Sequence, residues 1–158
     1  MSPTSVTPAT RTPLTFVPAA WSVEVRADRA YFDRLQPDDV EFPADCPPKT
    51  YALEAPEVLI GRRSASRGVE PDIDLGCEPV DSAISHRHAV LRRADDGTYT
   101  IADLESTNGT CINDGDKPIE AGVEHALCDG DRIHLGAWTT ITVRAGPPER
   151  ITEEAVRR

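Results

Sequence analysis

The sequence is poor in aromatic residues and methionine, and it contains no long apolar run. Phe, Trp and Tyr make up 5% of the 158 residues, and there is one Met. No stretch approaches the roughly 18 apolar residues that a membrane-spanning helix needs. No basic segment followed by an apolar core opens the chain, so we expect no signal peptide. These absences predict one soluble, cytoplasmic domain with some length left for tails.

Basic residues are also scarce. Lys and Arg number 17 against 27 Asp and Glu, which gives a formal net charge of −10 at pH 7. A chain this acidic repels a polyanion, so we expect no nucleic-acid binding through a broad basic face, although a small local anion site stays possible. The cysteines are far apart and include no C-x-x-C pair, which predicts free thiols and no zinc site at Cys46, Cys77, Cys111 and Cys128.

Proline and glycine, in contrast, are abundant. Fourteen prolines and ten glycines disfavour a helical bundle, because each proline in a helix interior costs about 3 kcal/mol. Short segments of alternating apolar and polar residues are separated by turn signals such as Asp95-Asp96-Gly97. This pattern predicts an all-β sandwich or barrel. The expected strands are residues 21–26, 51–54, 57–60, 87–93, 98–102, 110–113, 132–135 and 138–144, with a fragment at 73–75 and one helical turn around Tyr31.

The two ends of the chain lack this alternation. Residues 1–19 are rich in Pro, Thr, Ser and Ala, so we expect a flexible tail or a linker between domains. Its threonines are candidate phosphorylation sites for a kinase, although their presence is also explained if they only keep the tail solvated. Residues 147–158 form a charged tail with a helix-forming composition.

The stretch 84–90 allows three interpretations. Ser85 and His88 have the spacing of a nucleophile and its base. His86 and His88 have the spacing of two metal ligands. The whole stretch could also be a polar turn that precedes a strand. A hydrolase also needs an acid and an oxyanion hole, and no G-x-S-x-G elbow is present. A metal site needs further converging ligands. We therefore expect a turn, with no catalysis, no metal and no cofactor.

Polar residues at three expected turns favour a phosphate site. Arg62 follows one strand, Ser85 precedes another, and Thr107 and Asn108 lie between two more. Loops of a β-sandwich gather at its two ends. A forked guanidinium, a hydroxyl and an amide gathered there suit a phosphate on an extended peptide.

The order of these motifs resembles the forkhead-associated (FHA) domain family. Each piece is weak alone, but all four in order are specific: Gly61-Arg62, Ser85-x-x-His88, Ser106-Thr107-Asn108-Gly109-Thr110 and Gly130-Asp131-x-Ile133-x-Leu135-Gly136. The pattern covers residues 58–144, and the strand at 21–26 extends the expected domain to residues 20–146. The resemblance implies an eleven-stranded β-sandwich, with flexible N-terminal and C-terminal tails, that binds phosphothreonine peptides through loops at one end.

The resemblance also implies the roles of the binding residues. Arg62 and Ser85 would bind the phosphate, and Thr107 would line the pocket for the phosphothreonine methyl group. Asn108 would hold the peptide backbone just after the phosphothreonine. His86 would also contact the peptide. It departs from the Arg or Asn that the family often has there, and an imidazole makes its contribution depend on pH.

Other residues are expected to shape the site without touching the ligand. Gly61, His88 and Gly109 would support the turns, and Gly109 would do so by accepting a positive φ. Arg87 is expected to have a lesser role, because it points away from His86 once the strand has begun. The segment 63–83 is longer than in compact members of the family.

The expected function is that of a phosphothreonine-peptide-binding adaptor in Ser/Thr protein kinase signalling, without catalysis. The expected partners are phosphothreonine-containing proteins, either substrates of such kinases or the kinases themselves, and neither nucleic acid nor membrane. Two alternatives stay open. The same sandwich could act as a phospho-independent scaffold, or a phosphorylated tail threonine could dock in its own pocket and regulate it.

Overall fold

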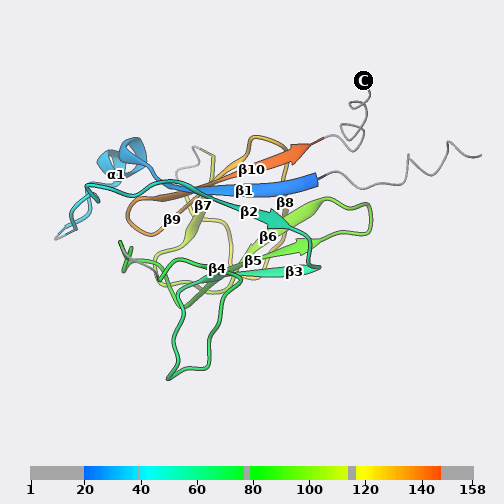
Figure 1. Cartoon of the computed structure of the whole chain (residues 1–158), viewed down its shortest axis with the longest axis horizontal. Coiled ribbons are helices and arrows are strands. Elements are labelled where there is room, and N and C mark those ends of the chain that lie inside the picture. Colours follow the sequence, from blue (N-terminus) through cyan, green and yellow to red (C-terminus); the bar gives the residue numbers. More distant parts are fainter. Residues whose placement is uncertain (1–19, 39, 77–78, 114–116, 147–158) are drawn as a thin grey trace, which may run out of the picture.

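The fold is a β-sandwich of two five-stranded sheets with one short helix (Figure 1). The computed structural model describes residues 20–38, 40–76, 79–113 and 117–146. The predicted tails at 1–19 and 147–158 lie outside these residues, as do Cys77 and residues 114–116. No described helix is both long and apolar enough to cross a membrane.

The first sheet joins the two ends of the domain. Its strands follow the order β2–β1–β10–β9–β7, and every neighbouring pair is antiparallel. β1 and β10 pair along their whole length, with Val23 opposite Val143. The bounds are β1 Ala20–Ala27, β2 Lys49–Leu53, β7 Thr110–Ile112, β9 Arg132–Leu135 and β10 Thr139–Gly146.

The second sheet carries the loops that form the candidate site. Its order is β4–β3–β5–β6–β8, and only the β3–β4 pair is parallel. The predicted turn at 95–97 joins β5 to β6, with Gly97 at φ 90°. The register of β3 against β5 shifts between Ile60 and Gly61. The bounds are β3 Glu57–Gly61, β4 Ile73–Asp74, β5 Arg87–Arg93, β6 Tyr99–Asp103 and β8 His125–Ala126.

The helix α1, Arg29–Leu35, covers the position where one helical turn was predicted. It begins at Asp28, whose carboxylate accepts a hydrogen bond from the backbone nitrogen of Tyr31, and it ends at Gln36 in the left-handed conformation. An N-cap carboxylate satisfies one of the backbone N–H groups that a helix start leaves without a partner. The Tyr31 side chain is buried and donates to the Gly136 carbonyl oxygen at 2.9 Å, so the helix closes over one end of the first sheet.

All nine predicted strand segments have a counterpart in the structure. β8 was not predicted, because two residues are too short to show an alternation. The described residues hold ten strands, and the eleventh stays a prediction. The centre of β5 is buried on both faces, from His88 to Leu91. The buried core between the sheets includes Trp21, Val23, Ile60, Leu91, Tyr99, Ile101, Ile133, Leu135, Ile141 and Val143.

Candidate functional site

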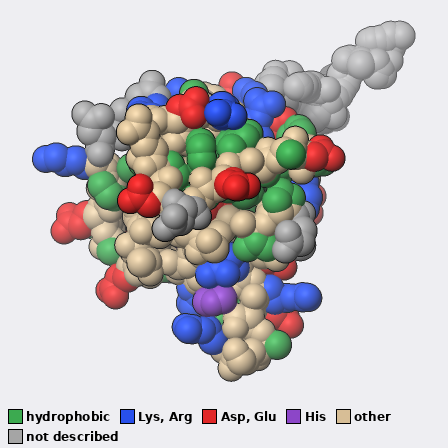
Figure 2. All heavy atoms as spheres, turned by 90° about the vertical axis from the view of Figure 1, so that its left-hand side faces the viewer, with side chains coloured by type: hydrophobic (Ala, Val, Ile, Leu, Met, Phe, Trp, Pro, Cys, Tyr) green, Lys and Arg blue, Asp and Glu red, His purple; other side chains and the backbone are tan. Residues whose placement is uncertain are grey.

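Three loops meet at one end of the sandwich and enclose a pocket of about 590 Å³. They follow β3, precede β5 and follow β6. Every residue predicted to bind the ligand lines this pocket, although these residues come from parts of the chain up to 46 positions apart: Arg62, Ser85, His86, Thr107 and Asn108. Figure 2 shows histidine and basic side chains gathered where the long β3–β4 loop protrudes from the body.

Arg62 spans the gap between β3 and the loop before β5. Its backbone nitrogen donates to the His86 carbonyl oxygen at 3.1 Å, and its Nε donates to the carbonyl oxygen of Ile84. Among the described residues, no carboxylate forms a salt bridge with this guanidinium. The two terminal nitrogens of Arg62 are therefore available to an anion in the pocket.

Ser85 connects two of the loops. Its Oγ accepts a hydrogen bond from the backbone nitrogen of Thr107 at 2.9 Å. A hydroxyl that accepts one bond still has a proton to donate, so Ser85 can donate to a ligand without giving up this contact. Asn108 connects the same two loops through its side chain, whose Nδ2 donates to the Ala83 carbonyl oxygen at 2.8 Å. Both contacts hold the 105–109 turn against the loop before β5.

His86 faces the β3–β4 loop. Its side chain is half-buried, and its Nδ1 lies 3.1 Å from the carbonyl oxygen of Arg62. Since a carbonyl oxygen only accepts, Nδ1 carries the proton in this contact. The other ring nitrogen is left for the pocket or for solvent.

His88 lies beneath the pocket and is fully buried. Its Nε2 donates to the Gly109 carbonyl oxygen at 2.9 Å, and its Nδ1 accepts from the backbone nitrogen of Ser85 at 3.0 Å. The ring is therefore neutral and protonated on Nε2. Burial lowers its pKa below the usual value of 6.5, although the Gly109 contact and the carboxylates of Asp103 and Asp81 act in the opposite direction.

These contacts decide between the interpretations of the 84–90 stretch. The imidazole of His88 binds the backbone nitrogen of Ser85, and the Ser85 Oγ accepts from Thr107. His88 is thus not placed as a base for the Ser85 hydroxyl. Because both of its ring nitrogens are bonded to backbone groups, it is not placed as a metal ligand either. The stretch is a polar turn that leads into β5.

Two predicted glycines stand where a side chain would not fit. A Cβ added to Gly61 would lie 1.8 Å from the carbonyl oxygen of His86, because β3 and the start of β5 approach closely at the register shift. Gly109 has φ +86°, and a Cβ there would lie 2.8 Å from the Pro118 side chain. Both positions need glycine for steric reasons.

The buried carboxylate of Asp103 was not predicted. It accepts from the Ser106 nitrogen at 3.0 Å, from Ser106 Oγ at 2.6 Å and from Thr110 Oγ1 at 2.7 Å. Burial by itself raises the pKa of this carboxyl, but the hydrogen bonds from Ser106 and Thr110 outweigh it and lower the pKa. The sequence contained a signal for this contact, an Asp three residues before a Ser, because short polar side chains of this kind hydrogen-bond to the backbone of turns.

Asp81, also missed, holds the loop before Ser85 in place. Its buried carboxylate accepts from Ala83, Ala137 and Trp138 nitrogens and from Thr139 Oγ1, at 2.9 to 3.2 Å. It links the loop before Ser85 to the turn before β10. No local pattern could reveal this contact, because most of its partners lie 56 to 58 residues further along the chain.

Comparison with known proteins assigns the fold to a family. Residues 58–136 match the family model described as the FHA domain, which is half of the chain. The chain belongs to the FHA domain family. The predicted resemblance is confirmed.

Two curated proteins resemble this chain over about half of their length. It is 30% identical over 89 residues to the oxoglutarate dehydrogenase inhibitor of Corynebacterium diphtheriae, covering 56% of each protein. It is also 30% identical over 83 residues to the glycogen accumulation regulator GarA of Mycolicibacterium smegmatis, covering 52% of this chain and 48% of GarA. The chain thus spans about half the length of these curated relatives.

One similar solved structure comes from a structural and functional study of phosphothreonine-dependent FHA domain interactions. That chain is 32% identical to this one and superposes with a TM-score of 0.50. The match covers 80% of this chain and 98% of the other. The likeness therefore extends over nearly the whole of that FHA domain.

Proposed function

We propose that this chain is a phosphothreonine-peptide-binding module that acts in Ser/Thr kinase signalling and performs no catalysis. One observation carries the proposal: the five predicted binding residues line a single pocket, in which the guanidinium of Arg62 and the hydroxyl of Ser85 keep donors for an anion. The similar FHA structure described through phosphothreonine-dependent interactions supports the same ligand. The proposed partners are phosphothreonine-containing proteins, either kinases or their substrates.

In the proposed complex, Arg62 and Ser85 bind the phosphate. Thr107 contacts the phosphothreonine methyl group, Asn108 binds the peptide backbone just after it, and His86 contacts the peptide beside it. An arginine and a hydroxyl suit this ligand because phosphate carries about −1.5 to −2 charges at pH 7 and offers three strong acceptor oxygens. Each charge-assisted hydrogen bond is worth about 1.5–3 kcal/mol.

We further propose that the FHA domain occupies residues 20–146. The full pairing of β1 with β10 supports these bounds, because it ties the first described strand to the last one. The domain would act in the cytoplasm.

The direct test is calorimetry with a degenerate phosphothreonine peptide library. Wild-type protein is expected to bind it and to lose binding on phosphatase treatment of the peptides. Arg62→Ala should weaken binding by on the order of a hundredfold, which corresponds to about 2.7 kcal/mol. Its fold should persist, because the side chain is only half-buried.

Arg144→Ala is the matched control, since this arginine is exposed and lies on β10 in the other sheet. It should bind like the wild type. Equal binding by Arg62→Ala, or equal binding of dephosphorylated peptides, would contradict the proposal. The second of these results would instead favour the phospho-independent scaffold.

A further inference from the structure

We propose that the site accepts peptides with two anionic groups, the phosphothreonine and a second phosphate or carboxylate a few residues away. The proposal rests on the proposed function and extends it to the choice of ligand. It comes from a second hollow beside the pocket, of about 720 Å³, lined by Leu59, Arg63, Ser64, Ala65, Gly68, Val69, Glu70 and Arg87. Val69 and Arg87 also line the first pocket, so the two hollows adjoin along these residues.

Arginine is concentrated in the walls of these two hollows. Besides Arg62, they contain Arg63, Arg67 and Arg87, all three of them exposed. Within the described part of the chain, none of the three forms a salt bridge. Arginines elsewhere do find acidic partners: Arg92, for example, binds Glu57 and Glu124 at 3.0 and 3.1 Å.

The walls of the two hollows hold more basic than acidic side chains. Asp74 accepts from the backbone nitrogens of Arg63 and Gly76 at 3.0 and 2.9 Å, and Asp72 accepts from the Leu59 nitrogen at 2.8 Å. Both keep their negative charge, but neither lies in the walls of the two hollows. Glu70 and Glu105 do line the walls, so four arginines face two glutamates. The lining of the two hollows is therefore positive on a chain of net charge −10.

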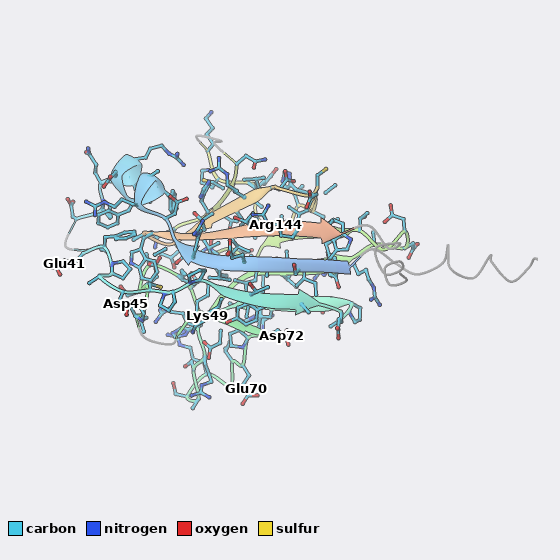
Figure 3. The ribbon with its side chains drawn as sticks, turned by 45° about the horizontal axis from the view of Figure 1, so that its top comes forward. Glu41, Asp45, Lys49, Glu70, Asp72 and Arg144 are labelled. Atoms are coloured by element: carbon cyan, nitrogen blue, oxygen red, sulfur yellow. The ribbon has the colours of Figure 1, made fainter. Side chains whose placement is uncertain are left out.

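The β3–β4 loop holds its arginines in an ordered turn. Ser64 and Val69 exchange two backbone hydrogen bonds at 3.0 and 2.9 Å, and Gly68 has φ +67°. Val69 is buried at the base of this turn, while Arg67 lies in the segment that it closes. Figure 3 shows Glu70 and Asp72 on this protruding loop and Arg144 away from it on β10. A fixed loop reduces the entropy lost when an anion binds.

These features fit an extended peptide whose second acidic group lies across Arg87 from the phosphothreonine pocket. Exposed arginines bind carboxylates weakly, and a doubly charged phosphate binds them more strongly. We therefore expect a preference of about fivefold for a second carboxylate, and a larger one for a second phosphate. The preference should shrink at high salt, because the guanidinium groups are exposed. The phosphothreonine remains the primary contact.

The experiment compares affinities for two kinds of peptide. The first has one phosphothreonine with neutral flanking residues. In the second kind, Asp or a second phosphothreonine is added two to six residues before or after that phosphothreonine. The protein variants are the Arg63→Gln/Arg67→Gln pair, Arg87→Gln and the control Arg144→Gln. On one side of the phosphothreonine, the second anion should raise affinity at least fivefold. The loop pair and Arg87→Gln should each reduce this gain to twofold or less. Because Arg67 and Arg87 also line the first pocket, the gain is taken as the ratio of the two affinities measured on the same variant, and in Arg144→Gln it should stay at least fivefold.

Three results would overturn the proposal. The first is no gain from the second anion at any position. The second is a gain that survives in both the loop pair and Arg87→Gln. The third is an equal loss of the gain in Arg144→Gln. Failure of the neutral phosphothreonine peptide to bind wild-type protein would instead overturn the proposed function, and this inference with it. Unchanged melting temperatures confirm that the variants are folded. The Asp and phosphothreonine arms show which anion the site prefers.

Discussion

The candidate site consists of two layers that differ in burial and in bonding. The contact layer, defined as Arg62, Ser85, His86, Thr107 and Asn108, is half-buried or exposed and lines the pocket. The support layer, defined as Gly61, His88, Asp103 and Gly109, lies beneath it, and both of its polar side chains are almost fully buried. The side chains of Arg62, Ser85 and Asn108 bond to neighbouring loops and keep donors for a ligand. Support-layer side chains make all their bonds within the protein.

This difference shows how the fold separates binding from stability. Buried polar groups stabilise a structure only when they are fully hydrogen-bonded. His88 and Asp103 meet that condition, and in doing so they fix the loops that carry Ser85, Thr107 and Asn108. Substitutions in the support layer should therefore lower stability and affinity together. Substitutions in the contact layer should lower affinity with a much smaller effect on stability.

Gly61→Ala should have the largest effect on stability. Its Cβ would lie 1.8 Å from the His86 carbonyl oxygen, so β3 and β5 must move apart. We expect the free energy of unfolding to fall by at least about 3 kcal/mol. Urea denaturation measures this. Gly68→Ala is a control for glycine content, since no atom lies within 4 Å of a Cβ added there, although Gly68, unlike Gly61, has a positive φ. It should cost about 1 kcal/mol. Equal losses in both variants would show that the close approach is unimportant.

His88→Ala should lower the free energy of unfolding by about 2 kcal/mol, because it leaves the Ser85 nitrogen and the Gly109 carbonyl oxygen without their partner. Phosphothreonine-peptide affinity should fall as well, since the two loops lose their common anchor. Both quantities are measured on the same protein, by urea denaturation and calorimetry. A loss of affinity with unchanged stability would move His88 from the support layer into the contact layer.

Asn108→Ala should have the opposite signature. Its side chain is exposed and makes one bond, to the Ala83 carbonyl oxygen. We expect affinity to fall about five- to tenfold, which corresponds to about 1–1.4 kcal/mol. The melting temperature should stay close to that of the wild type. A variant that unfolds more easily but binds normally would contradict the proposed contact with the peptide backbone.

The smallest predicted effect is on pH dependence. Burial lowers the pKa of His88 in the folded state, so the unfolded chain takes up a proton at a higher pH than the folded chain. The contribution of His88 to stability is then complete above its ordinary value of 6.5 and is lost as pH falls below it. Urea denaturation from pH 7.5 to 5 should show this loss. His88→Gln cannot titrate and should show a weaker dependence. Identical slopes in the two proteins would contradict the assignment of His88 as a buried neutral ring.

Much of this arrangement could be predicted from the sequence. The alternation of apolar residues located the strands, since it reflects the period of a half-buried sheet. The four motifs brought together Arg62, Ser85 and Asn108, because each motif marks a loop end and sandwich loops gather at the ends. The resemblance to the FHA domain family could therefore be predicted from the sequence, and the match of the family model confirms it.

The parts that could not be predicted depend on contacts distant in sequence. Asp81 reaches Ala137 and Thr139, and no local period records such a pairing. Arg87 was assigned a lesser role, because a strand residue next to His86 was expected to point away from the pocket. In the structure it lines both hollows, so the arginines around the pocket form a larger group than the motif indicates.

The central claim is that a phosphothreonine peptide binds at the contact layer. Titration of the ¹⁵N-labelled protein with a degenerate phosphothreonine peptide library, followed by amide chemical shifts, tests it most directly. The largest shifts should fall on the backbone amides of Arg62, Ser85 and Thr107, and those of β1 should hardly move. Absence of shifts at these loops, or shifts concentrated on the β1–β2 face, would contradict the account.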